Sequence, residues 1–245
     1  MSSLCTRGGV VGLVAAISSV ALVVGVAPPA GGAPRTAVRA ATAAGSPVRY
    51  TVRAGDSFYS IANKFGIHAG ALAAGNHFTL SSLIYPGQVL VIPGVQLPAH
   101  LPANLPAPLT ANPERLLLYP YFVAASKESG VPADLLMATA YVESGWKQTA
   151  VSPTGAIGVG QLRPETSAWI GAFLFRDDGL DAANARDNIR MSARLLRYLL
   201  DTYANDTRRA VAAYYQGSGS VARDGVTATG LTYAGKILGL RPAFA

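Results

Sequence analysis

One carboxyl group in this sequence has the setting of a catalytic proton donor. The apolar residues between Pro132 and Glu143 recur at helical spacing, and a helix start tolerates the proline. On that helix Glu143 shares a face with Leu136 and Ala140. Because removal from water penalises the charged form, we expect a raised pKa at Glu143, as a general acid near neutral pH requires. From position alone, an ordinary surface or capping glutamate is the alternative.

A glycine-rich segment follows the expected helix. Gly145 offers a helix stop, and Trp146 is a large residue that can pack beside it. Residues 152–162 then contain three glycines and a proline, so they cannot form a regular helix, and their backbone can approach a ligand closely. Gln161 is the polar side chain near the end of this stretch. The pattern predicts an acid beside a polar binding loop, with a plain surface loop as the alternative.

Three ordered segments resemble the signatures of the soluble lytic transglycosylase family, which shares the goose-type lysozyme fold. They are the pair Glu143-Ser144, residues 155–162 and residues 212–217, and the similarity extends over about residues 113 to 241. The resemblance implies a mainly α, lysozyme-like catalytic domain over residues 112–245, with Glu143 as the catalytic acid and the Tyr214 hydroxyl near it. It also implies substrate-binding roles for Ser144, Gln161, Tyr214 and Tyr215.

Two of these segments depart from the usual family forms. Where the family usually has Gly-Leu-Met-Gln, Val159 and Gly160 precede Gln161. Where it usually has Tyr-Asn-Ala-Gly, Tyr215 and Gln216 replace the Asn and the Ala. A substrate contact made by that Asn therefore does not transfer directly to this chain.

The family's chemistry needs a single carboxyl group. Its glutamate protonates the bond between N-acetylmuramic acid and N-acetylglucosamine, then takes the proton of the muramic acid C6 hydroxyl, which closes a 1,6-anhydro ring. Most glycosidases use two carboxylates. The nearest ones on either side of Glu143 in sequence are Asp134, over two helical turns before it, and Glu165, at the expected start of another helix. The sequence therefore fits a reaction that uses one acid. The alternatives are a hydrolytic muramidase and a non-catalytic wall-binding protein with a degenerate lysozyme-like fold.

A small domain precedes the catalytic region. Residues 49–53 alternate like a strand, residues 57–65 and 69–75 have helical patterns with Asp56 as the expected N-cap of the first, and residues 89–92 form a second strand. This small α+β unit of βααβ order resembles a LysM module over residues 49–93, with its Gly-Asp-Ser and Tyr-Pro-Gly turns in place. LysM modules bind N-acetylglucosamine-containing glycans.

The resemblance places a glycan groove at two turns of this module, residues 55–58 and 83–86. Phe58 and Tyr85 can instead pack a very small core, and this alternative stays open. The residues expected to bind glycan are Gly55, Asp56, Ser57, Phe58, Ile84, Tyr85 and Pro86.

The N-terminus has the pattern of an export signal. Arg7 precedes an apolar run over residues 10–26, and small residues suited to cleavage follow, so we expect a signal peptide over residues 1–33 and a flexible spacer over residues 34–48. Cleavage would remove Cys5, the one cysteine, and leave no stable membrane span; an uncleaved anchor is the alternative. The expected location is secreted and associated with the cell wall.

Residues 94–111 form a proline-rich linker between the two domains. In polyproline geometry such a segment reaches on the order of 50 Å and would act as a semi-rigid tether. Its leucines also permit an alternative hypothesis, in which the linker docks on the catalytic domain.

Charge and histidine content limit the partners. The net charge of +7 arises from 20 basic and 13 acidic residues, and the basic residues are spread along the chain, whereas a nucleic-acid surface concentrates them. A modest attraction to an anionic cell wall fits this charge. The three histidines, His68, His77 and His100, all precede the catalytic region, which therefore has no His-based metal site or triad. We expect a monomer that acts on peptidoglycan glycan strands, with no metal, no cofactor and no nucleic acid.

Overall fold

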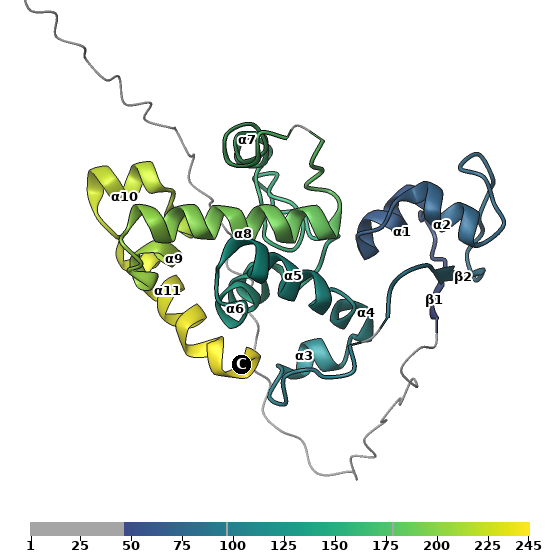
Figure 1. Ribbon diagram of the computed structural model, residues 1–245, viewed down its shortest axis with the longest axis horizontal. Helices are drawn as coiled ribbons and strands as arrows, with labels where there is room; N and C mark the ends of the chain where they lie inside the picture. Colours follow the sequence, from purple (N-terminus) through teal and green to yellow (C-terminus); the bar gives the residue numbers. More distant parts are fainter. Residues whose placement is uncertain (1–46, 97, 178) are drawn as a thin grey trace, which may run out of the picture.

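The computed structural model describes residues 47–96, 98–177 and 179–245. The expected signal peptide and nearly all of the expected spacer lie outside this range. The described residues form a small α+β unit at one end of the molecule and a larger, mainly helical unit beside it (Figure 1). This architecture is the one expected from the sequence.

The small unit has the expected βααβ order. Its two strands pair antiparallel, with Tyr50 opposite Leu90, and both side chains are buried against the helices. Alternation along the second strand leaves Val89 exposed, because successive side chains of a strand point to opposite faces. The elements in order are β1 (Val48–Thr51), α1 (Phe58–Phe65), α2 (Ala69–Gly75) and β2 (Val89–Ile92).

The predicted N-cap of α1 is wrong by one residue. Ser57 caps this helix, since its Oγ accepts a hydrogen bond from the Ser60 backbone N–H (3.1 Å), and the Ser60 Oγ accepts one from the Ser57 N–H (2.9 Å). Asp56 instead accepts hydrogen bonds from the Tyr50 hydroxyl (2.8 Å) and the Arg53 N–H (2.7 Å). Asp56 therefore closes the turn after β1, and burial together with this carboxylate raises the pKa of Tyr50 to about 12.

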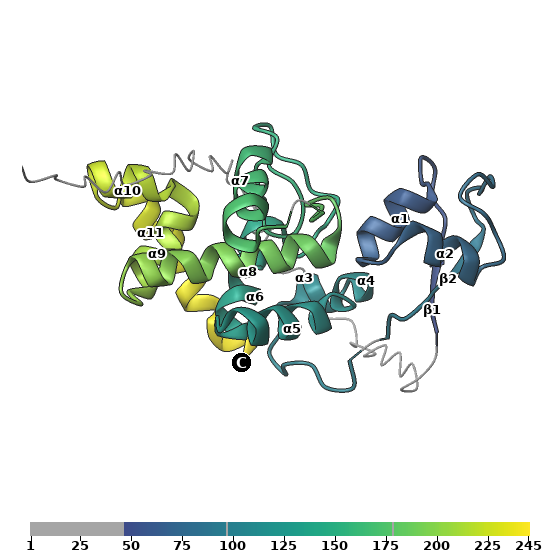
Figure 2. The same cartoon turned by 45° about the horizontal axis from the view of Figure 1, so that its top comes forward.

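The helical unit is built around α6 (Ala133–Ser144), in which residues 135–140 are all buried. A helix buried on every side needs neighbours on every side. They are α5 (Tyr119–Ser129), α8 (Ala185–Thr202), α11 (Ala228–Leu240) and the C-terminal 3-10 turn (Arg241–Phe244). The longest helix, α8, crosses the whole unit (Figure 2). The other helices are α4 (Pro113–Leu116), α5 (Tyr119–Ser129), α7 (Pro164–Trp169), a π-helix (Ile170–Phe175), α8 (Ala185–Thr202), α9 (Thr207–Gln216), α10 (Ser218–Asp224), α11 (Ala228–Leu240) and a 3-10 turn (Arg241–Phe244).

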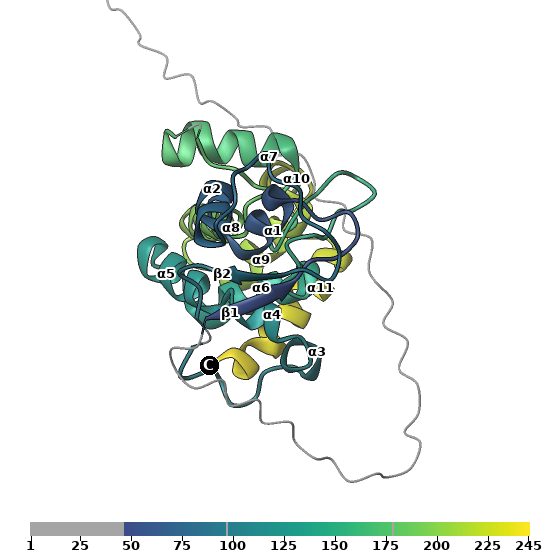
Figure 3. The same cartoon turned by 90° about the vertical axis from the view of Figure 1, so that its right-hand side faces the viewer.

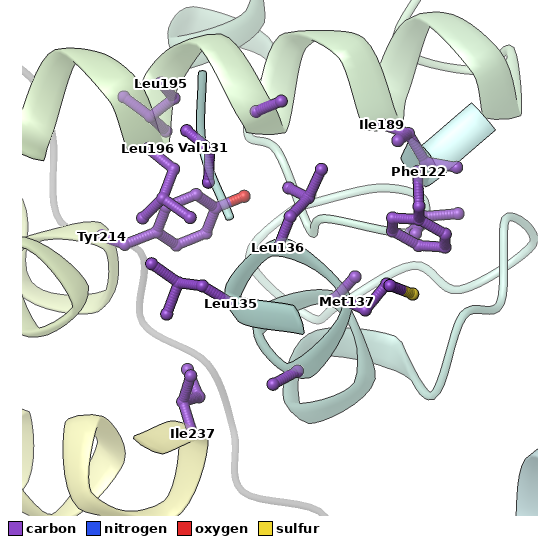
Figure 4. Close-up of a cluster of buried hydrophobic side chains, with 14 of the residues drawn as sticks. Phe122, Val131, Leu135, Leu136, Met137, Ile189, Leu195, Leu196, Tyr214 and Ile237 are labelled. Carbon is purple, nitrogen blue, oxygen red and sulfur yellow. The ribbon is translucent and has the colours of Figure 1, made fainter. Parts of the chain in front are cut away.

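The end of α6 is fixed by Trp146, which follows the helix stop. Its indole N–H donates a hydrogen bond to the Met137 carbonyl (3.0 Å), so the chain folds back on its own helix. The ring packs against Phe122 and Phe244, with centroid distances of 4.4 and 5.8 Å. Met137 and Phe122 face the same core in Figure 4. The packing of a large aromatic side chain thus holds the turn of α6 that carries the candidate acid.

The linker is packed and not extended. Its last part forms the short helix α3 (Ala107–Thr110), and Leu105 and Leu109 are buried in the core of the helical unit, with Leu101 packed against it. Pro108 lies in the first turn of α3, where its missing N–H costs no helical hydrogen bond. The prediction of an extended tether is therefore wrong. The alternative hypothesis, in which the leucines dock on the helical unit, is confirmed.

The two units are packed against each other, with α1 against α8 (Figure 3). Leu117, just after α4, is buried in the hydrophobic core of the small unit. The Tyr121 hydroxyl donates a hydrogen bond to the Phe65 carbonyl (2.9 Å). At Gly66, which has a φ of +67°, a methyl group would come within 2.9 Å of the Tyr121 ring and the Arg186 backbone. Only glycine therefore allows this close approach.

A Leu117→Ala change should loosen the small unit. It removes a buried side chain from that core, so we expect a loss of about 2–3 kcal/mol in the stability of α1 and its neighbours. Amide hydrogen exchange of residues 58–65 measures the effect. Val123→Ala, at an exposed position of α5, is the control. Unchanged exchange in Leu117→Ala would show that the small unit is complete without the helical unit.

Candidate functional site

Glu143 lies in the last turn of α6 and is half-buried. The helix stops at Gly145, whose φ of +63° is a left-handed conformation that glycine adopts at little cost. The Glu143 Oε1 accepts a hydrogen bond from the hydroxyl of Tyr233 in α11. The candidate acid is therefore held between two helices that are distant in sequence.

Tyr233, which contacts the candidate acid, was not predicted from the sequence. It is only 9% exposed, and burial, followed by the nearby charge of Glu143, raises its pKa well above the usual 10. The phenol therefore keeps its proton at neutral pH and can donate it in a hydrogen bond to the carboxylate. The available signal was weak: Tyr233 and Ile237 form a short buried stripe at helical spacing, outside the three quoted segments.

Tyr215 lies next to this pair. Its ring stacks on Tyr233 with a centroid distance of 4.9 Å and an interplanar angle of 26°. The tyrosine that replaces the usual Asn thus supports the residue that contacts the acid. Its predicted substrate contact stays a prediction.

Gln216, the second departure in this segment, has a structural role. Its side chain is buried, and its Nε2 donates to the Ser220 Oγ (3.0 Å) and the Gly225 carbonyl (2.9 Å). Its Oε1 accepts from the Thr227 N–H (3.0 Å) and the Thr227 hydroxyl (3.1 Å). Thr227 is the N-cap of α11, so Gln216 fixes the start of the helix that carries Tyr233.

Ser144 connects the acid's helix to the glycine-rich loop. Its hydroxyl donates to the Val159 carbonyl (2.8 Å) and accepts from the Lys147 N–H (3.0 Å). These contacts give Ser144 a positioning role. Binding of substrate by this residue stays a prediction.

The glycines of the loop are required by close packing. Gly158 has a φ of +78°, and a methyl group there would lie 2.3 Å from the Asn188 side chain. At Gly160 a methyl group would lie 1.8 Å from the Ser192 hydroxyl, and the Gly160 N–H donates to the Asn188 Oδ1 (2.7 Å). The loop is thus clamped onto α8, and the Gly160 departure is explained by the space that Ser192 fills.

Gln161 has a φ of +48°, which is uncommon for a residue other than glycine. Its side chain is buried, and its Nε2 donates to the carbonyls of Gly158 (3.0 Å) and Ala150 (3.3 Å). The strained backbone is therefore held by the side chain of the same residue. Such strain is typical of functional sites, and the substrate-positioning role of Gln161 stays a prediction.

Tyr214 is 1% exposed and extends from α9 into the core beside Leu135 and Leu196 (Figure 4). Its hydroxyl donates to the Gly160 carbonyl (2.9 Å). Burial, then the charge of Glu143, raises the pKa of Tyr214 above its usual value. The charge of Glu143 thus acts on Tyr214, while the hydrogen bond from the Tyr214 hydroxyl to Gly160 holds the glycine-rich loop in place.

The nearest carboxylate on each side of Glu143 in sequence is paired with an arginine. Asp134, in the first turn of α6, pairs with Arg241 (2.6 Å). Glu165, in the first turn of α7, pairs with Arg163 (3.2 Å). Neither of these two ion pairs involves Glu143.

The predicted glycan-binding turns of the small unit differ in exposure. Phe58 is 3% exposed and packs against Phe78, so its alternative reading as a core residue is confirmed. Tyr85 is 62% exposed and is not a core residue. Leu83, in the second predicted turn, is also exposed, as is Tyr59, which lies outside the predicted turns. Gly55, Ser57 and Pro86 are exposed as well, while Asp56 and Ile84 are half-buried.

Residues 47–96, 98–177 and 179–245 contain no group of three or more His, Cys, Asp or Glu side chains that could hold a metal ion. In the same part of the chain, no helix combines the length and hydropathy that crossing a bilayer requires.

Comparison with known families finds two matches. Residues 120–233 match the Transglycosylase SLT domain, and residues 50–93 match the LysM domain. The chain therefore carries an SLT domain preceded by a LysM domain. The SLT match ends at Tyr233, the partner of Glu143.

Individual relatives are similar to part of this chain. The membrane-bound lytic murein transglycosylase F of Thiobacillus denitrificans is 38% identical over 118 residues, which cover 45% of this chain and 24% of that protein. The peptidoglycan transglycosylase gp16 of Escherichia phage T7 is 33% identical over 98 residues, 40% of this chain and 7% of that protein. The 70-kDa soluble lytic transglycosylase of Escherichia coli has a TM-score of 0.47 and 21% identity over 51% of this chain and 23% of that chain. This chain thus spans less than a quarter of the length of each of the three.

Tyr→Phe changes at positions 233 and 214 test two different roles: contact with Glu143 and support of the glycine-rich loop. Tyr233→Phe removes the hydroxyl that orients Glu143, so it should lower kcat by about tenfold to a hundredfold. Tyr214→Phe leaves the buried Gly160 carbonyl without its donor, so it should cost about 1–3 kcal/mol of stability. Wall turnover and thermal unfolding of both variants measure these effects. A kcat of the Tyr233→Phe variant equal to that of the wild type would show that the contact between Tyr233 and Glu143 has only a structural role.

Proposed function

We propose that this chain is a peptidoglycan lytic transglycosylase that cleaves the β-1,4 bond between N-acetylmuramic acid and N-acetylglucosamine and forms 1,6-anhydro-N-acetylmuramic acid. The observation that carries this proposal is the single acid Glu143, held by Tyr233 at the end of a buried helix. The SLT domain match supports it, as does the similarity to murein and peptidoglycan transglycosylases.

Glu143 performs both proton transfers of the reaction. As an acid it protonates the glycosidic oxygen, and the bond from C1 of the muramic acid to that oxygen breaks. As a carboxylate it then takes the proton of the C6 hydroxyl, whose oxygen attacks C1 and closes the ring. No water is consumed, so Glu143 ends the cycle protonated again. Tyr233 stays protonated throughout and holds the carboxyl group in one orientation.

The LysM domain holds the enzyme on its substrate. We place glycan contact at Tyr85 and the turns around it, because an exposed aromatic ring can stack on a sugar face. The protein acts as a monomer outside the cell, at the cell wall, after export directed by residues 1–33. Envelope association is supported by the LysM domain; export is supported by the sequence pattern alone.

A Glu143→Gln change should abolish release of soluble fragments from purified peptidoglycan. The amide keeps the size of the side chain but has no proton to transfer, so leaving-group assistance is lost while the fold is kept. Turbidity of a wall suspension measures turnover, and thermal unfolding checks the fold. Glu165→Gln, which removes an exposed carboxylate, is the matched control and should keep turnover within about twofold. Turnover by a folded Glu143→Gln protein would exclude Glu143 as the acid.

A Tyr85→Ala change should weaken retention on the wall and leave turnover of short soluble glycans unchanged. The ring is exposed, so its loss should alter stability by less than about 0.5 kcal/mol. Sedimentation with purified wall measures retention. Val89→Ala, at an exposed position of β2, is the control. Equal retention of Tyr85→Ala and wild type would place the glycan contact elsewhere on the small unit.

A further inference from the structure

A cleft of about 510 Å³, named here the interdomain cleft, lies between the small unit and the helical unit. Both units contribute to its walls, and its lining contains neither Glu143 and Tyr233 nor the predicted glycan turns. Lys147 is shared with the site only through its backbone N–H, which donates to Ser144. Its volume is in the range of pockets that bind small ligands or a few residues of a peptide. The lining residues are Arg53, Lys64, Ala111, Asn112, Pro113, Glu114, Arg115, Leu118, Trp146, Lys147, Gln148 and Thr149.

The side chains that line this interdomain cleft carry a net positive charge. Arg53 and Lys64 come from the small unit, and Arg115 and Lys147 come from the helical unit. Glu114 is the single carboxylate in the lining, and it contacts Arg53 (3.0 Å) and Lys64 (2.5 Å). One negative charge faces four positive ones, so the cleft as a whole favours an anionic group.

The cleft is directly connected to the helix that carries the acid. Arg115 Nη1 donates to the carbonyl of Gly145, the stop of α6 (3.3 Å). Trp146 and Lys147, which follow that stop, form part of the wall. A ligand in this interdomain cleft would therefore lie on the chain segment that ends the acid-bearing helix.

We propose that the interdomain cleft binds the carboxylate-bearing peptide stem of a peptidoglycan strand. This inference rests on the proposed function, since a strand held by the LysM domain and processed by the SLT domain carries its peptides along the same molecule. Arginine and lysine side chains bind carboxylates through charge-assisted hydrogen bonds. The carboxylate of Glu114 provides an acceptor for peptide N–H groups or an amine, and it disfavours a polymer with a charge on every unit.

The test uses direct binding, so it does not depend on turnover. The probe is a soluble disaccharide with a tetrapeptide stem, and the reference probe is the same disaccharide without the peptide. Both are titrated by calorimetry into Glu143→Gln protein, which cannot consume them. Lys147→Gln and Arg53→Gln, made separately in that background, should each weaken binding of the peptide probe about threefold to tenfold and leave the reference probe unchanged. Lys127→Gln, at an exposed position of α5, is the matched control.

Three results would overturn the proposal. Equal binding of the two probes would show that the peptide is not recognised. Unchanged binding in both Lys147→Gln and Arg53→Gln would place the peptide elsewhere. Direct binding of a soluble phosphodiester wall polymer, with no binding of the peptide probe, would assign the cleft to phosphate. A different result would separate this proposal from the proposed function. If the wild type releases no fragments from purified wall while the Glu143→Gln protein binds the peptide probe as expected, the enzymatic function is wrong and the peptide-binding role of the cleft is retained.

Discussion

The hydrogen bond from Tyr233 to Glu143 is the contact on which the arrangement of this site depends. A carboxyl group at the end of a buried helix is costly unless polar partners satisfy it. Here the partner comes from a different helix, so α6 and α11 must pack with their polar side chains in register. Gln216 fixes the start of α11, and Trp146 fixes the end of α6. Each of these contacts therefore acts on the acid indirectly, through the geometry of one hydrogen bond.

A second set of contacts holds the loop beside the acid. Ser144 ties this loop to α6, Asn188 ties it to α8, and Tyr214 ties it to α9. The backbone can lie this close to α8 only because residue 160 has no side chain. The departures from the usual family segments are thus compensated locally: Ser192 occupies the space next to Gly160, and Tyr215 stacks on Tyr233.

Much of the fold could be predicted from the sequence because its signals are local. The helix before Glu143, its stop at Gly145 and the βααβ order depend on patterns within about ten residues. Tyr233 could not be found in this way, since its contact with Glu143 spans 90 residues. The choice of Ser57 over Asp56 as the cap depended on competing hydrogen bonds of adjacent residues. The buried leucines of the linker required knowledge of the surface on which they dock.

In the proposed reaction one acid suffices because the substrate supplies its own nucleophile. Asp134 and Glu165 are paired with arginines, so no second carboxylate is evident among these sequence neighbours of Glu143. Mass analysis of the fragments that the wild-type protein releases from purified peptidoglycan tests this most directly. We predict chains that end in 1,6-anhydro-N-acetylmuramic acid and contain no added water. Fragments that end in a reducing N-acetylmuramic acid would contradict the account and would show hydrolysis by a positioned water molecule.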